Sequence, residues 1–171
     1  MAIACAFQSP ERIHMAGAVW LIRRVPARMR TQLKINRAGN WSWDMMRVLY
    51  VEEHAESCEL LVLWLRGSGY EVVPANTISE GLRLAKSAAF DAYLLSSLFT
   101  DGTGPDLCRE IRSFDSSTPI IFYSALSRDR DLEAAIGAGA QAYLIKPDDL
   151  DKIEPTITRL IGVRQAKRSA P

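Results

Sequence analysis

From Met46 onward, short apolar runs alternate with amphipathic stretches in which apolar residues recur every three or four positions. The apolar runs have the length of β-strands and the amphipathic stretches the length of helices. The predicted strands are 48–51, 70–74, 91–96, 119–123 and 142–145. The 91–96 run is almost entirely apolar, as a strand covered on both faces must be. Repeated strand–helix units predict an α/β fold with a doubly wound parallel sheet.

A helix is expected after each strand. The last helix should reach Val163 and contains Pro155, so it either starts near Glu154 with the proline in its first turn or is kinked there. The other predicted helices are 55–66, one from near 79, one from 105 and one through 132–137. Residues 164–171 are then a short basic tail, expected to be a frayed end or the beginning of a linker.

The carboxyl ends of the strands carry most of the polar residues that could do chemistry. Ligands of open parallel sheets bind at this edge, beside the point where the strand order reverses. The residues placed there are Glu52 and Glu53 after the first strand, Ser96 after the third, Ser124 after the fourth, and Lys146 with Pro147 after the fifth. This edge of the sheet is therefore the predicted functional site.

Charge divides the chain at about residue 45. The whole sequence has a net charge of +1, with 48% hydrophobic and 24% charged residues, as in a globular protein. Residues 1–45 contain seven basic and two acidic side chains, a balance of +5, which leaves 14 basic and 18 acidic side chains, or −4, for residues 46–171. A basic extension thus precedes an acidic domain, which we bound at residues 46–163.

Several interpretations of the extension remain open. The basic residues at 12–37, together with Trp20, Trp41 and Trp43 in the same extension, could form a nucleic-acid or membrane-surface arm. The segment also has the Arg-rich, acid-poor character of a targeting peptide. Alternatively, translation starts at Met45 or Met46, or residues 1–44 form a disordered tail. Nucleic-acid binding is expected only through residues 12–37. Separately, the apolar run at residues 15–22 is too short to span a membrane.

The cysteine pattern indicates a reducing compartment. Cys5, Cys58 and Cys108 lie far apart without a C-x-x-C pair, which suggests neither a zinc site nor a disulfide framework. Cys58 and Cys108 are expected to be packing residues on helix faces. We therefore expect a cytoplasmic protein.

Six segments in register resemble the receiver domain of two-component response regulators, over Met46 to Val163. The segments are Leu49–Glu53, Gly69–Val73, Phe90–Leu95, Asp101–Gly104, Pro119–Ala125 and Gly139–Pro147. The resemblance implies a flavodoxin-like strand order 2-1-3-4-5 with helices on both faces. It also implies an aspartate, phosphorylated in the family, at the end of the third strand, eight residues before the loop glycine.

Counting back from Gly104 places Ser96, and no aspartate, at the acceptor position. A carboxylate is ionised at neutral pH, whereas a serine hydroxyl needs a base to remove its proton as it attacks. Ser96 is therefore not the expected acceptor, and the receiver is interpreted as degenerate. Phosphorylation at a displaced residue, such as Asp101 or Ser97, remains an alternative.

The resemblance also implies roles for the other residues of this edge. Glu52 and Glu53 would be the acidic pair that binds Mg²⁺, but with one carboxylate lost we expect weak binding at best and no other cofactor. Ser124 and Tyr143 would be the switch residues, and Lys146 and Pro147 the lysine and a cis proline. Without an aspartate at position 96, Lys146 is expected to pair with Glu52 or Glu53. Each of these residues also has a purely structural interpretation. Glu52 and Glu53 would favour a helix N-terminus, and Ser124 would cap a turn. Tyr143 would be a packed aromatic on the fifth strand, and Lys146 a solvated loop lysine.

The predicted function is that of a stand-alone receiver-like signalling module, not an enzyme, acting through phosphorylation-independent protein contact. The resemblance implies a contact face on the fourth helix, fifth strand and fifth helix, for a histidine kinase, another regulator or a second copy. Two rivals are a nucleic-acid-binding protein and a flavodoxin-like cofactor binder. The glutamates at 52 and 53 disfavour the latter because they would repel a phosphate.

Overall fold

The computed structural model describes residues 33–35, 41–43 and 45–169. The chain divides into two compact units, Met1–Met45 and Met46–Pro171. In the first unit, strands β1 (Leu33–Ile35) and β2 (Trp41–Trp43) pair in antiparallel fashion. These two strands are the part of residues 1–44 that the structure describes, so the interpretation of a disordered tail falls mainly outside the described residues. The rest of the extension, including most of the proposed 12–37 arm, lies outside the described residues.

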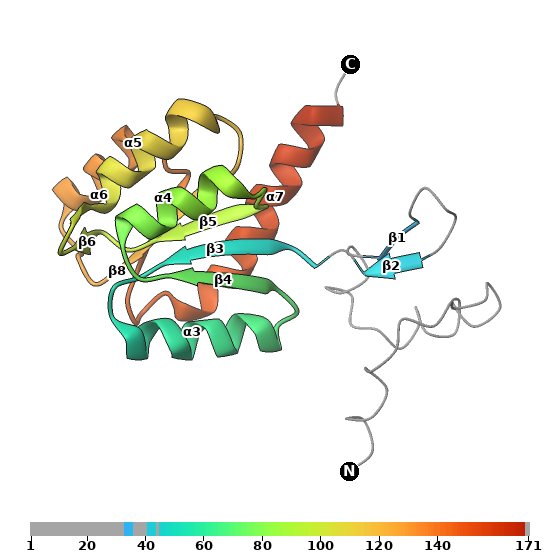
Figure 1. Cartoon of the computed structure of the whole chain (residues 1–171), viewed down its shortest axis with the longest axis horizontal. Helices are drawn as coiled ribbons and strands as arrows, with labels where there is room; N and C mark the ends of the chain where they lie inside the picture. Colours follow the sequence, from blue (N-terminus) through green and yellow to red (C-terminus); the bar gives the residue numbers. More distant parts are fainter. Residues whose placement is uncertain (1–32, 36–40, 44, 170–171) are drawn as a thin grey trace, which may run out of the picture. The chain divides into compact units, whose positions relative to one another are not determined.

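The second unit is built on one five-stranded parallel sheet of order β4-β3-β5-β8-β9 (Figure 1). Numbered within the sheet, this is the predicted order 2-1-3-4-5, which confirms the fold class. Every residue of β5 and β8 is buried, because helices cover both faces of these central strands. The strands are β3 (Arg47–Val51), β4 (Glu71–Ala75), β5 (Ala92–Leu95), β8 (Ile120–Ser124) and β9 (Ala142–Ile145).

Two hydrophobic cores form, one on each face of the sheet. Helices α3 (Ala55–Gly67) and α7 (Ile153–Ser169) cover one face, where their apolar residues pack against β3, β8 and the start of β4. Helices α4 (Ile78–Ser87), α5 (Gly104–Phe114) and α6 (Asp129–Gly137) cover the other (Figure 1). A short 3-10 helix, Leu150–Lys152, precedes α7. Cys58 and Cys108 are buried, one in each core. None of the described helices combines the length and apolarity that crossing a membrane requires.

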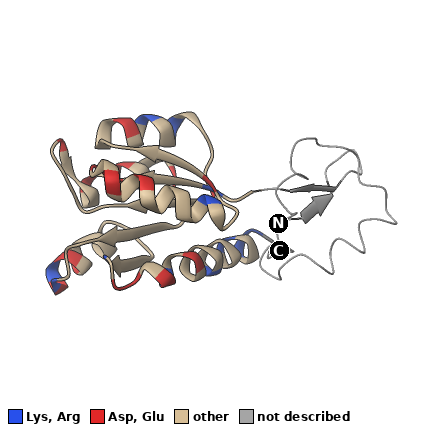
Figure 2. Ribbon diagram, turned by 90° about the horizontal axis from the view of Figure 1, so that it is seen from below, with Lys and Arg blue, Asp and Glu red and all other residues tan. Residues whose placement is uncertain are grey.

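Helix α7 is longer than predicted. It begins at Ile153, so Pro155 lies in the first turn, where its missing N–H removes no hydrogen bond. The helix continues past Val163, the residue that it was predicted to reach, and ends at Ser169. The residues after Val163 are good helix formers, and the basic ones near the C-terminus (Figure 2) interact favourably with the helix dipole.

The loop after β5 also contains unpredicted structure. Strands β6 (Leu98–Phe99) and β7 (Gly102–Thr103) form a small antiparallel hairpin immediately before α5. Phe99 is buried in the core beneath α4 and α5, which fixes the hairpin on the domain. The hairpin stands beside the carboxyl ends of the strands and shapes that edge of the molecule.

Candidate functional site

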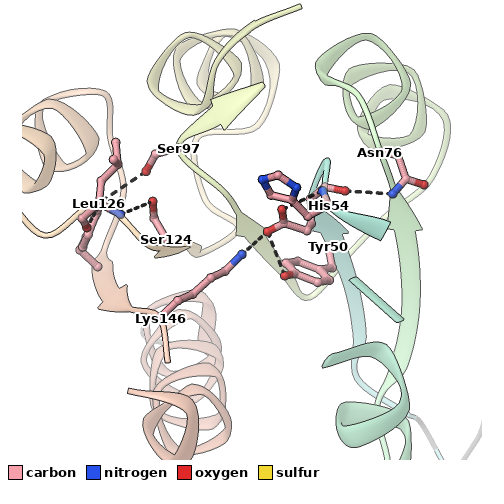
Figure 3. Close-up of polar contacts among 9 residues, drawn as sticks. Tyr50, His54, Asn76, Ser97, Ser124, Leu126 and Lys146 are labelled. Atoms are coloured by element: carbon pink, nitrogen blue, oxygen red, sulfur yellow. Dashed lines mark hydrogen bonds and ion pairs between the residues drawn. The ribbon is translucent and has the colours of Figure 1, made fainter. Parts of the chain in front are cut away.

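The carboxyl ends of four parallel strands bring the predicted site residues together. Pairing of Val51 with Leu95, and of Leu95 with Phe122, aligns the ends of β3, β5 and β8. Pairing of Ser124 with Ile145 places β9 at the same level. Residues that lie far apart in the sequence therefore meet at one edge (Figure 3).

Glu52 is the centre of this site. Its side chain is only 1% exposed, and it forms an ion pair with Lys146, which is 17% exposed. Oε1 of Glu52 accepts a hydrogen bond from the backbone N–H of His54 at 3.0 Å, and Oε2 accepts one from the Tyr50 hydroxyl at 3.2 Å. Figure 3 shows Lys146 and Tyr50 reaching the same carboxylate from β9 and β3. The ion pair predicted for Lys146 is present, and its partner is Glu52.

Tyr50 is a member of the site that the sequence analysis did not select. It is completely buried, and burial together with the negative charge of Glu52 raises the pKa of its hydroxyl far above the usual value. Tyr50 therefore remains a protonated hydrogen-bond donor. Because residues two apart on a strand share a face, its proximity to the Glu52 side chain could have been inferred from their spacing.

Glu53 does not share this role. Its Oε2 accepts a hydrogen bond from the backbone N–H of Thr100 at 3.0 Å, so its carboxylate holds the β6–β7 hairpin. The two glutamates of the predicted acidic pair thus have different partners. A strand end followed by a turn sends consecutive side chains in different directions, which the sequence pattern alone does not reveal.

Ser96 lies directly after β5 and is 8% exposed. Its backbone N–H donates to the carbonyl of Val51 at 3.0 Å, whereas the described residues offer its hydroxyl no hydrogen-bond partner. A Cβ added to Gly104 would lie 2.1 Å from the Ser96 carbonyl oxygen, so the start of α5 packs tightly against this strand end.

The two predicted switch residues meet at the loop after β8. The Ser124 hydroxyl accepts a hydrogen bond from the Leu126 amide at 3.2 Å, and the Tyr143 hydroxyl donates to the Leu126 carbonyl at 2.9 Å. The Tyr143 ring stacks on Phe122 with a centroid distance of 5.9 Å. Its hydroxyl also contacts Ser97 Oγ at 3.3 Å, a link the sequence analysis did not predict.

Asp101, the candidate for a displaced phosphate acceptor, forms hydrogen bonds with the N-terminus of α4. Its two carboxylate oxygens accept hydrogen bonds from the backbone N–H groups of Ile78 and Ser79, both at 3.1 Å, at the N-terminus of α4. Desolvation opposes ionisation of Asp101, but the hydrogen bonds from Ile78 and Ser79 together outweigh it and lower the pKa of Asp101. Asp101 therefore acts as a cap that joins the hairpin to α4.

The arrangement does not fit a divalent cation. Mg²⁺ requires several oxygen ligands with free lone pairs in octahedral geometry. Here the Glu52 oxygens face three donors, one of them the Lys146 ammonium, and Glu53 bonds to Thr100. Within residues 45–169, no group of three or more His, Cys, Asp or Glu side chains has a metal-binding arrangement.

The lysine is followed by a cis peptide bond, Lys146–Pro147, as predicted. Sequence comparison now places these features in a family, since residues 48–158 match the model of the response regulator receiver domain. The chain belongs to the response regulator receiver family. It is 31% identical over 121 residues to the transcriptional regulatory protein ZraR of Klebsiella oxytoca and 32% identical over 109 residues to the response regulator ArlR of Staphylococcus epidermidis. These matches cover 71% and 64% of this chain, but the chain spans only 27% and 49% of those two relatives.

Solved structures agree with the family assignment. The chemotaxis response regulator CheY4 of Vibrio cholerae has a TM-score of 0.63 and 25% identity, over 68% of this chain and 98% of its own. The response regulator TrrA of Thermotoga maritima, solved in complex with Mg²⁺ and BeF, has a TM-score of 0.61 and 27% identity, over 68% of this chain and 99% of its own. The receiver interpretation is thereby confirmed for residues 48–158, and the common topology is that of a receiver.

Proposed function

We propose that this receiver domain signals through protein–protein contact and is not phosphorylated at the end of β5. The proposal concerns residues 46–169, and it assigns the domain no enzymatic activity. It rests on the residue type at position 96 together with the contacts of the residues around it. The observation that carries it is the ion pair between Lys146 and the buried Glu52.

The ion pair supports the proposal because it balances charge within the site. Lys146 places its ammonium on Glu52, and the same carboxylate is further satisfied by Tyr50 and His54. A buried glutamate without a cation would be costly, and Lys146 supplies that cation. The site therefore has no electrostatic need for a phosphoryl group or a metal ion.

The chemistry of Ser96 supports it as well. A serine becomes a nucleophile when a neighbouring base accepts its proton. No described side chain accepts a hydrogen bond from Ser96, and the oxygens of the nearby Glu52 face the donors Lys146, Tyr50 and His54. Ser96 thus lacks the base that an attacking hydroxyl requires.

For the contact surface, we propose the face formed by α6, β9 and α7. Leu132 and Ile136 on α6 are exposed, and so is Leu150 just before α7. Pro155 lies in the first turn of α7 and leaves the rest of that helix continuous, so the face is regular. A kinase, another regulator or a second copy of the chain would bury these apolar side chains.

The test is the intact mass of the full chain after incubation with acetyl phosphate and Mg²⁺, beside a conventional receiver as positive control. The expected result is no gain of a phosphoryl group by the wild-type chain. A gain would contradict the proposal, and hydroxylamine would then identify its chemistry. A labile adduct would indicate a carboxylate such as Asp101, and a stable one would indicate Ser96 or Ser97.

The contact face has its own test. Ile136→Asp should abolish self-association, or binding of the partner, because it introduces a charge into the proposed apolar contact. Leu60→Asp on α3, which is also an exposed leucine on a helix, is the matched control. Equal effects of the two substitutions, measured by sedimentation and by binding, would rule out the α6–β9–α7 face.

A further inference from the structure

The loop between β8 and α6, residues 125–128, is held at Leu126 by two side chains. The amide of Leu126 donates to Ser124 Oγ, and its carbonyl accepts from the Tyr143 hydroxyl. Both backbone polar groups of this loop residue are therefore satisfied by side chains, one from β8 and one from β9. Figure 3 shows the contact of Ser124 with Leu126. The position of the Tyr143 hydroxyl thus bears directly on the conformation of the loop.

The single hydroxyl proton of Tyr143 decides which atom is the donor in the hydrogen bond between Ser97 and Tyr143. A tyrosine hydroxyl has one proton, and Tyr143 donates it to the Leu126 carbonyl. In the contact of 3.3 Å between Ser97 Oγ and the Tyr143 hydroxyl, Ser97 must then be the donor. Ser97 is 5% exposed and follows β5 by two residues, so a buried side chain of the strand-end site reaches across to β9.

We infer that Ser97 is a positioning residue that holds Tyr143, and through it the 125–128 loop, in one arrangement without any phosphoryl group. The chain of donors runs from Ser97 to Tyr143 to the carbonyl of Leu126. The parallel stacking of Tyr143 on Phe122 restricts the ring, so the hydroxyl is aimed by Ser97 and the backbone carbonyl together.

The functional consequence rests on the proposed contact face. The loop leads directly into α6, which carries Leu132 and Ile136. A loop held at Leu126 presents the beginning of α6 in a fixed position, which lowers the ordering cost of partner binding. Ser97 therefore links the strand-end site to the face where a partner is proposed to bind.

Two adjacent serines provide a matched experiment. Ser96 and Ser97 are both buried, but only the Ser97 hydroxyl contacts Tyr143. The measurement is hydrogen exchange of the Leu126 amide by NMR, together with the ring resonances of Tyr143, in the full chain. Ser97→Ala should accelerate exchange about two- to fivefold, at the low end for a hydrogen bond because 3.3 Å is long for two hydroxyls. Ser96→Ala should leave the rate unchanged, and Ser97→Thr, which keeps the hydroxyl, should restore it.

A double-substitution cycle tests whether Ser97 acts through Tyr143. Tyr143→Phe should accelerate exchange at least as much as Ser97→Ala, and the double variant should match Tyr143→Phe alone. The inference is overturned by an unchanged rate in Ser97→Ala, by an equal increase in Ser96→Ala, or by additive effects in the double variant. The exchange test does not depend on the phosphorylation test, so a chain that gains phosphate but passes the exchange test would contradict only the proposed function.

Discussion

Removing the ammonium of Lys146 should destabilise the domain far more than removing the charge of Glu52. In Lys146→Met the carboxylate of Glu52 stays buried, since its side chain is only 1% exposed. In Glu52→Gln the lysine, already 17% exposed, can extend into solvent along its flexible stem. The two substitutions remove the same ion pair but leave different groups behind.

The expected magnitudes follow from that asymmetry. Breaking a buried pair by removing one partner costs about 3–5 kcal/mol. Tyr50 and His54 continue to donate to Glu52, so we expect about 3 kcal/mol for Lys146→Met. Glu52→Gln should cost about 1 kcal/mol, in the range for one hydrogen-bonded group. The double variant should be within about 1 kcal/mol of the wild type because no unpaired charge remains.

Urea denaturation followed by far-UV circular dichroism measures these differences, provided that the slope of the transition is unchanged. Additive losses in the double variant would refute the reasoning, because they would mean that Lys146 and Glu52 act independently. So would a loss below about 0.5 kcal/mol for Lys146→Met, which would place the variant in the range of ordinary surface substitutions.

Two further predictions concern other parts of the domain. Gly104→Ala should destabilise by about 3 kcal/mol in urea denaturation, since its Cβ would lie 2.1 Å from the Ser96 carbonyl oxygen, whereas Gly137→Ala, with open space around it, should not destabilise. Partial burial opposes ionisation of Asp115, but hydrogen bonds from Thr118 and its neighbours lower the pKa of Asp115 from 3.8 to about 2. This stabilisation is complete above about pH 4 and is lost as pH falls toward 2, because the unfolded chain takes up the proton first. After solvent screening we expect about 1 kcal/mol, so the wild type should lose that much more than Asp115→Asn between pH 5 and 2, and parallel losses would contradict the assignment.

Most of the fold was predictable from periodicity because a parallel sheet covered on both faces requires apolar strands. The predicted range 142–145 coincides with β9, and the other four strands differ by a residue or so at their ends. Pro105 indicated the beginning of α5 correctly, since proline is tolerated in a first helical turn. The errors lie where packing outweighs local sequence. The β6–β7 hairpin is held by the burial of Phe99 and by the Glu53–Thr100 contact, neither of which has a local signature.

The sequence predicted which residues form the candidate site, but not which of them contact one another. The spacing of residues at the strand ends predicted which side chains would gather, and the structure brings Glu52, Ser96, Ser124 and Lys146 to one edge. Which glutamate would pair with the lysine depended on the turn after β3. The contact of Ser97 with Tyr143 depended on the relative height of β5 and β9, which are not neighbours in the sheet. Such contacts are set by tertiary geometry, so one sequence gives no signal for them.

Because position 96 is a serine and not an aspartate, the positive charge of Lys146 is enough to balance the negative charge of Glu52. Glu52 and Lys146 form a one-to-one pair, and Glu53 is satisfied at the hairpin. Ser96→Asp would place a second carboxylate at the end of β5, near an ion pair with no spare cation, and like charges in a partly buried site repel by about 1 kcal/mol or more. We therefore expect this variant to be less stable than the wild type in chelator, and to recover stability when Mg²⁺ is added because the divalent charge offsets the repulsion. Ser96→Asn, nearly the same size but neutral, should show no response to Mg²⁺, and neither should the wild type. A wild-type chain stabilised by Mg²⁺ as strongly as Ser96→Asp would show that Lys146 and Glu52 do not saturate each other, and the argument from charge balance would then be wrong.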